Sequence, residues 1–139
     1  MSTADLLEAW PPSRLQEVMD EALIRWNVED LRAAIGVCWN PRLRTTIGRA
    51  LLDDMVVELN PTLLARYPEE VRPVLLHEAA HLVVRRLFGP STPPHGKFWK
   101  AYMRSVGVST RATHNLDVSG LRRPRRRKGW RLVKQLLHR

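Results

Sequence analysis

A five-residue motif near the middle of the chain constrains its fold more than any other feature. Residues 77–81 read His77-Glu78-Ala79-Ala80-His81, which is the H-E-x-x-H pattern. In a helix, positions i and i+4 lie one turn apart on the same face, so both imidazoles can reach one metal ion. Glu78 projects beside them, where it can take a proton from a water molecule at the metal. The motif therefore predicts a helix that carries a metal site.

The residues on either side of the motif predict that this helix is buried. It is flanked by the apolar runs Val74-Leu75-Leu76, Leu82-Val83-Val84 and Leu87-Phe88. A helix that is apolar nearly all round packs inside a protein. Two histidines and a glutamate in such a helix need partners, because unpaired polar groups are costly to bury. A zinc ion supplies those partners, and we favour a metal site over a purely structural histidine pair.

A hydrolytic zinc site needs a third protein ligand and one open coordination position. A histidine six residues after the second ligand is excluded, because Leu87 stands there, and no glutamate follows Glu78. The ligand types that remain downstream are His95, His114, His138 and Asp117. We favour His95, because the motif helix should end at Gly89-Pro90 and a short turn then leads to this histidine. The alternative is a loop histidine that caps the next helix.

A second amphipathic segment follows His95 directly. Residues 97–106 carry apolar side chains at helical spacing, namely Phe98, Trp99, Tyr102, Met103 and Val106. Two antiparallel helices joined by a short loop would bring the start of the second near the end of the first. This arrangement would place His95 beside the motif.

The rest of the chain predicts a helix followed by a small sheet. An amphipathic helix is expected over residues 13–26, capped by Ser13 with Gln16 three residues on. Strand-like runs follow at residues 33–39, 44–51 and 55–59. Pro61 should start a short helical turn, and the motif helix should begin near Pro73, since a first turn tolerates proline. The predicted fold class is α+β, with a small, mostly antiparallel sheet packed on the metal-bearing helices.

The order of these features along the chain is specific. The motif is followed by a proline-containing loop, His95-Gly96, Met103 and Gly107. Weaker matches lie at Trp39-Asn40, Thr45-Thr46-x-Gly48-x-Ala50, Val57-Glu58-Leu59-Asn60-Pro61 and Arg111-Ala112-Thr113-His114. With these features, the sequence of residues 13–123 resembles the SprT-like domain family, which includes bacterial SprT proteins and the eukaryotic Spartan proteases.

The resemblance implies a small zincin-like domain of minimal gluzincin type, a zinc metalloprotease fold that we assign to residues 1–121. It implies one catalytic Zn²⁺ ion, with His77, His81 and His95 as ligands and Glu78 as general base. His114 matches a family position and is a candidate donor to the oxyanion that develops during peptide hydrolysis. A surface histidine is the alternative for His114. Family members often act on proteins bound to DNA.

The chain departs from the family at its cysteines. Many bacterial SprT proteins carry a C-terminal zinc ribbon with paired Cys-x-x-Cys, whereas these 139 residues contain a single cysteine, Cys38. A cysteine zinc site and an internal disulfide are therefore both excluded within this sequence. Cys38 lies in a strand-like run and is expected to be a small core residue.

The positive charge is concentrated in the last part of the sequence. Residues 1–99 hold 11 Lys and Arg against 13 Asp and Glu, whereas residues 100–139 hold 12 against 1. We assign residues 122–139 to a basic tail, whose central cluster is Arg122, Arg123, Arg125, Arg126, Arg127 and Lys128. Such a cluster binds phosphate backbones by counterion release, without reading sequence. We expect DNA contact here, and a solvated extension is the alternative.

We expect a cytoplasmic protein and favour a monomer, and a DNA contact would allow it to associate with the nucleoid. No apolar run is long enough to span a membrane, and the N-terminal residues lack the basic and apolar regions of a secretory signal. At 139 residues, one domain with one core is the default. Residues 130–138 carry apolar side chains at helical spacing, which could pack on the domain or bind a partner.

Two functions from different classes fit these features. The first is a zinc-dependent endopeptidase that acts on a protein substrate at or near DNA, with Glu78 activating the attacking water. The second is a DNA-binding accessory protein whose zinc site is structural or inactive. The open coordination position and Glu78 favour the first, because a structural site needs no base.

Overall fold

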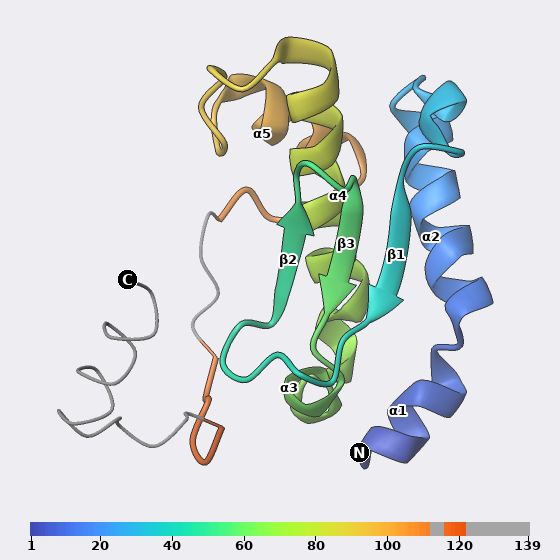
Figure 1. The fold of residues 1–139 in the computed structure, drawn as a ribbon, viewed down its shortest axis with the longest axis vertical. Helices are drawn as coiled ribbons and strands as arrows, with labels where there is room; N and C mark the ends of the chain where they lie inside the picture. Colours follow the sequence, from blue (N-terminus) through green and yellow to red (C-terminus); the bar gives the residue numbers. More distant parts are fainter. Residues whose placement is uncertain (112–115, 122–139) are drawn as a thin grey trace, which may run out of the picture.

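The computed structural model describes residues 1–111 and 116–121, and it confirms the α+β class: helices pack around a three-stranded sheet (Figure 1). The chain begins with the helices α1 (Thr3–Ala9) and α2 (Pro12–Arg25). The strands follow, β1 (Gly36–Trp39), β2 (Gly48–Leu51) and β3 (Val56–Leu59). Next come the helices α3 (Pro61–Arg66), α4 (Val71–Phe88) and α5 (Lys97–Ser105). Short 3-10 turns, η1 (Glu29–Leu31) and η2 (Pro68–Glu70), precede β1 and α4.

The sheet is mixed, so the prediction of a mostly antiparallel sheet is wrong. The central strand β3 is parallel to β1 and antiparallel to β2. The short turn at residues 52–55 folds β3 directly back on β2, which makes this pair antiparallel. The longer segment 40–47 carries the chain from the end of β1 to the far edge of the sheet, beyond β3. β1 therefore pairs with β3 in the same direction, and β2 is an edge strand.

Helix α4 is the buried helix that the motif predicted. It packs against β2 and β3 and also contacts α2 and α5, and Figure 1 shows it behind the strands. The helix begins two residues before Pro73, and it ends at Gly89, where a positive φ of 84° breaks the helical path. The core around α4 includes the fully buried side chains of Leu15, Met19, Leu23, Leu59, Leu75 and Leu82.

Strand β2 approaches α4 most closely at Gly48. A Cβ atom at this position would lie 2.7 Å from Val74 Cγ1 and 3.2 Å from Leu59 Cδ2. A residue without a Cβ is therefore needed for this contact. The close approach brings the edge strand alongside the helix that carries the motif.

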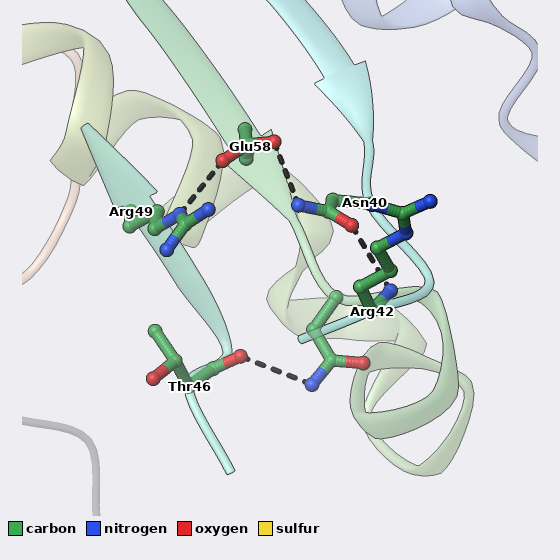
Figure 2. A network of polar contacts seen from close by, with 6 residues as sticks. Asn40, Arg42, Thr46, Arg49 and Glu58 are labelled. Atoms are coloured by element: carbon green, nitrogen blue, oxygen red, sulfur yellow. Dashed lines mark hydrogen bonds and ion pairs between the residues drawn. The ribbon is translucent and has the colours of Figure 1, made fainter. Parts of the chain in front are cut away.

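A polar network fixes the segment between β1 and β2 (Figure 2). The Glu58 carboxylate on β3 accepts hydrogen bonds from Arg49 Nε on β2 and from Asn40 Nδ2 after β1, both at 2.7 Å. The buried side chain of Asn60, after β3, donates to the Thr46 carbonyl at 3.0 Å. These bonds join both ends of the segment to β3 and its C-terminal end, so they hold β2 in place as the edge strand.

Two local predictions are also wrong, and α1 was not predicted. Cys38 is exposed rather than part of the core. Side chains alternate along a strand, and here the neighbouring Val37 and Trp39 pack against the core. Ser13 does not cap α2, because the helix already starts at Pro12, whose missing N–H suits a first turn.

Candidate metal centre

The structure brings three histidines together from two places in the chain. His77 and His81 lie one turn apart on α4, and His95 lies in the loop that precedes α5. His95 Nε2 is 3.0 Å from His81 Nε2 and 3.4 Å from His77 Nε2. One ligand atom from each of the three lies within 4.8 Å of the others. The expected juxtaposition of His95 with the motif is confirmed.

This cluster fits a metal ion by its geometry and by its chemistry. Zinc–nitrogen bonds of about 2.0–2.1 Å at a tetrahedral ion place ligand nitrogens about 3.4 Å apart. The two Nε2 separations that involve His95, 3.0 and 3.4 Å, are close to this value. Imidazole nitrogens suit zinc and several other first-row metals. The three histidines can therefore hold a divalent metal ion such as zinc.

Burial keeps the ligand imidazoles in the form that binds metal. The pKa of His81 is lowered to about 4, chiefly by burial and also by the neighbouring His95. Burial and then the charge of Lys100 lower the pKa of His95. A lowered pKa means that the ring is neutral near pH 7, and a neutral ring has a lone pair free for coordination.

Trp99 on α5 packs against all three histidines, a role that sequence reasoning missed. Its indole is fully buried, lies nearly parallel to the His81 ring and meets the rings of His77 and His95 edge-on. Its Nε1 donates a hydrogen bond to the His77 backbone carbonyl at 3.1 Å. The amphipathic pattern of residues 97–106 places Trp99 on the inner face of α5, but it says nothing of what that face contacts.

Glu78 lies beside the three histidines. Its carboxylate Oε1 is 3.8 Å from His77 Nε2. Burial raises its pKa to about 8. A cation held by the histidines would lower this pKa again, because a nearby positive charge favours the ionised carboxylate. A cation in the site would therefore favour the ionised form of Glu78, which can accept a proton.

The site opens into a cleft of about 410 Å³ between β2 and the end of α4. Its walls include Glu78, His81 and His95 on one side and Gly48 and Ala50 of the edge strand on the other. Two arginines also line it. Arg49 is paired with Glu58 at 2.7 Å, and Arg85 is 3.7 Å from the highly exposed Asp53.

The other predicted site residues do not join this cluster within the part of the chain that the structure describes. Asp117, an alternative third ligand, is exposed, and its carboxylate accepts hydrogen bonds from Ser119. Outside the described residues lie His114, His138, the segment 130–138 and the basic cluster of Arg122, Arg123, Arg125, Arg126, Arg127 and Lys128. No described helix is both long and apolar enough to cross a bilayer.

Comparison with known proteins agrees with this geometry. The sequence pattern of the SprT-like family matches residues 15–119. Protein SprT from Escherichia coli O1:K1 is 43% identical over 81 residues, which are 57% of this chain and 48% of that protein. Protein SprT from Escherichia fergusonii matches with the same identity and coverage. The aligned part thus spans about half the length of these relatives. The match confirms the resemblance seen in the sequence, and the chain belongs to the SprT-like family.

Proposed function

We propose that this chain is a zinc-dependent endopeptidase of the SprT-like type, a minimal gluzincin that cleaves proteins at or near DNA. The observation that carries the proposal is the convergence of three imidazole nitrogens beside a partly buried carboxylate at the wall of an open cleft. A purely structural zinc site has four protein ligands and no use for a base. Within the described residues, only the three histidines form such a cluster.

In this proposal the side chains have separate roles. His77, His81 and His95 hold the ion, and Trp99 fixes the His77 backbone and the faces of the rings. When bound, a zinc ion supplies Lewis acidity, which polarises the scissile carbonyl and acidifies water. Glu78 takes the proton of the attacking water on a carboxylate oxygen and passes it to the leaving amide nitrogen.

The edge strand suggests how a substrate would lie. β2 borders the cleft and pairs with β3 on its other side. An extended peptide can add to such an edge through main-chain hydrogen bonds. Gly48, Arg49 and Ala50 of β2 line the cleft, so a peptide added at this edge would lie beside the histidine cluster. This mode selects for unfolded or extended segments more than for a particular sequence.

The proposal has three further parts, which concern His114, the basic cluster and the oligomeric state. His114 would donate a hydrogen bond to the developing oxyanion. The basic cluster at residues 122–128 would hold the enzyme near DNA-bound substrates and so raise their local concentration. The active species would be a monomer. The competing function is a DNA-binding accessory protein with an inactive zinc site, which metal and cleavage assays can distinguish from a peptidase.

The test is a metal assay together with a cleavage assay. Purified protein should contain about one zinc per chain. His95→Ala should lose most of it, while His138→Ala should keep it. Glu78→Gln should keep zinc and fold but lose cleavage of an unfolded protein substrate by at least about 10²-fold, because an amide cannot accept the proton. The exposed Glu69→Gln is the matched control and should remain active.

Three results would contradict the proposal. Zinc loss in His114→Ala with full zinc in His95→Ala would overturn the ligand set. Equal cleavage by the Glu78→Gln variant and the unchanged chain would remove the proposed mechanism. Stoichiometric zinc without cleavage of any protein, with or without DNA, would favour the accessory-protein function instead.

A further inference from the structure

A second pocket, of about 460 Å³, shares no lining residue with the metal cleft. It is formed by α2, the first turn of α4, and the end of α5 with the loop that comes after it. Each of these three elements contributes an exposed arginine, namely Arg25, Arg72 and Arg104. Glu21 is the only acidic residue among those that line it. The pocket is therefore a concave surface with excess positive charge.

The charge of this arginine pocket is not balanced by ion pairs. Among the described residues, the three pocket arginines have no carboxylate partner within 4.0 Å, as is also true of Arg42, Arg44 and Arg86 outside the pocket. Arg72 Nη2 instead donates to the Val106 backbone carbonyl at 3.3 Å, across the pocket on the loop after α5. This bond uses one of the five guanidinium N–H groups and leaves the others for a ligand.

Helix electrostatics account for two of the arginines but not for the third. Arg25 and Arg104 lie in the last turns of α2 and α5, where a cation is favourable beside the carbonyl end of the helix. Arg72 lies in the first turn of α4, an 18-residue helix with no acidic residue in that turn. The acidic residues Glu69 and Glu70 directly precede this turn, and Arg72 also bonds to the end of α5. Even so, three arginines line one pocket together with a single carboxylate, and a bound anion would reduce the repulsion among them.

We propose that this pocket binds phosphate groups, and that they belong to the backbone of a nucleic acid. Guanidinium groups bind phosphate oxygens in a bidentate fashion, which makes arginine the preferred residue for this task. A free phosphate or a small phosphorylated compound offers the same chemistry. The nucleic acid is favoured by the charge of the chain beyond the pocket, because residues 108–139 hold 10 Lys and Arg against 1 Asp. This inference does not depend on the proposed peptidase activity.

The experiment compares two triple variants of the full chain that lose the same charge. One changes Arg25, Arg72 and Arg104 to Ala. The control changes Arg42, Arg44 and Arg86 to Ala, three exposed arginines that line neither pocket. Binding of a labelled DNA oligonucleotide is followed by fluorescence anisotropy between about 50 and about 200 mM salt. Thermal melting and zinc content check that both variants fold.

The pocket variant should bind DNA at least tenfold more weakly. Its plot of log affinity against log salt should be less steep by about 2–3, since each lost phosphate contact removes about 0.9 from the slope. The control variant should keep the slope of the unchanged chain. Arg72→Ala alone should make the plot of log affinity against log salt less steep by about 1. This single variant gives the same test if the triple variant folds poorly.

Two outcomes would overturn the inference. Equal losses in the two triple variants would mean that only net charge matters and that the pocket is no site. Inorganic phosphate serves as the second probe. If it raises the melting temperature of the unchanged chain but not of the pocket variant, while DNA affinity is equal in both, the pocket takes a small phosphate and the nucleic-acid assignment is wrong.

Discussion

The indole of Trp99 is fully buried beneath the three histidines and is bonded to the backbone of one of them. Groups that orient metal ligands from behind commonly change metal affinity by about 10- to 100-fold when they are removed. Trp99 acts through ring packing and a backbone bond rather than through a ligand N–H. We therefore expect its influence on metal affinity to lie at the lower end of this range.

Replacing Trp99 by phenylalanine tests this role. Trp99→Phe keeps an aromatic ring but loses the bond to the His77 carbonyl, so zinc should bind about tenfold more weakly. The matched control is Trp39→Phe at the opposite edge of the sheet, which also loses an indole bond to a backbone carbonyl, that of Trp10. A chelator competition titration measures zinc affinity, and urea unfolding measures stability. If both variants change zinc affinity equally, Trp99 is only a core residue.

Single residues were predictable where a local pattern carried the chemistry. His77 and His81 follow from their spacing within one helix, and His95 follows from the short list of ligand types downstream. The contact between Trp99 and the motif joins residues 22 positions apart and leaves no pattern in the sequence. Cys38 was placed in the core from its residue type, whereas its position in the alternation of β1 decides its exposure.

At the scale of elements, the contact between β2 and α4 depends on Gly48. Gly48→Ala would place a Cβ 2.7 Å from Val74 Cγ1. The strand must then shift, at a cost of about 1–3 kcal/mol in unfolding free energy. Because β2 also borders the metal cleft, cleavage should fall as well. Urea unfolding and the cleavage assay measure the two effects.

The control for this prediction is Gly36→Ala in β1. Its Cβ would meet only Val56 Cγ2, at an ordinary contact distance of 3.7 Å. Removing a glycine from a position that tolerates a side chain stabilises a protein by up to about 1 kcal/mol. Gly36→Ala should therefore be neutral or slightly stabilising, with unchanged cleavage. A similar stability loss in both variants would show that strand flexibility matters, not the contact with α4.

The elements themselves were more predictable than their arrangement. Hydrophobic spacing located α2, α4, α5 and the three strands to within a few residues. The pairing of the strands depends on where segment 40–47 leads the chain, which the polar contacts of Asn40, Glu58 and Asn60 determine. Those contacts join residues far apart in sequence, so the parallel pairing of β1 with β3 was not predicted. α1 was missed because its seven residues are too few for a clear hydrophobic period.

For the whole molecule, the distribution of charge separates two parts of the chain. Residues 1–99, which supply the candidate metal centre, carry a small excess of acidic residues, and the basic excess lies wholly after them. The tail at residues 122–139 follows from this distribution, whereas the arginine pocket joins Arg25 and Arg72 of the first part to Arg104 of the second. We expect both groups of cations to contact a nucleic acid. Salt dependence can measure each group separately, since contributions to the slope add with the number of phosphates contacted.

Deleting residues 122–139 removes nine basic residues and no acidic ones. If about half of them contact phosphates, the tail contributes about −4 to the slope of log affinity against log salt, and the shortened chain loses this part. Zinc should be retained, because His77, Glu78, His81 and His95 all precede the cut. A full-length control with glutamine at the six basic positions of residues 122–128 should lose most of the same slope, which separates charge from chain length.

Anisotropy titrations with DNA at several salt concentrations measure each slope. Equal slopes and affinities in the intact and shortened chains would mean that the tail does not contact DNA, and binding would then rest on the arginine pocket alone.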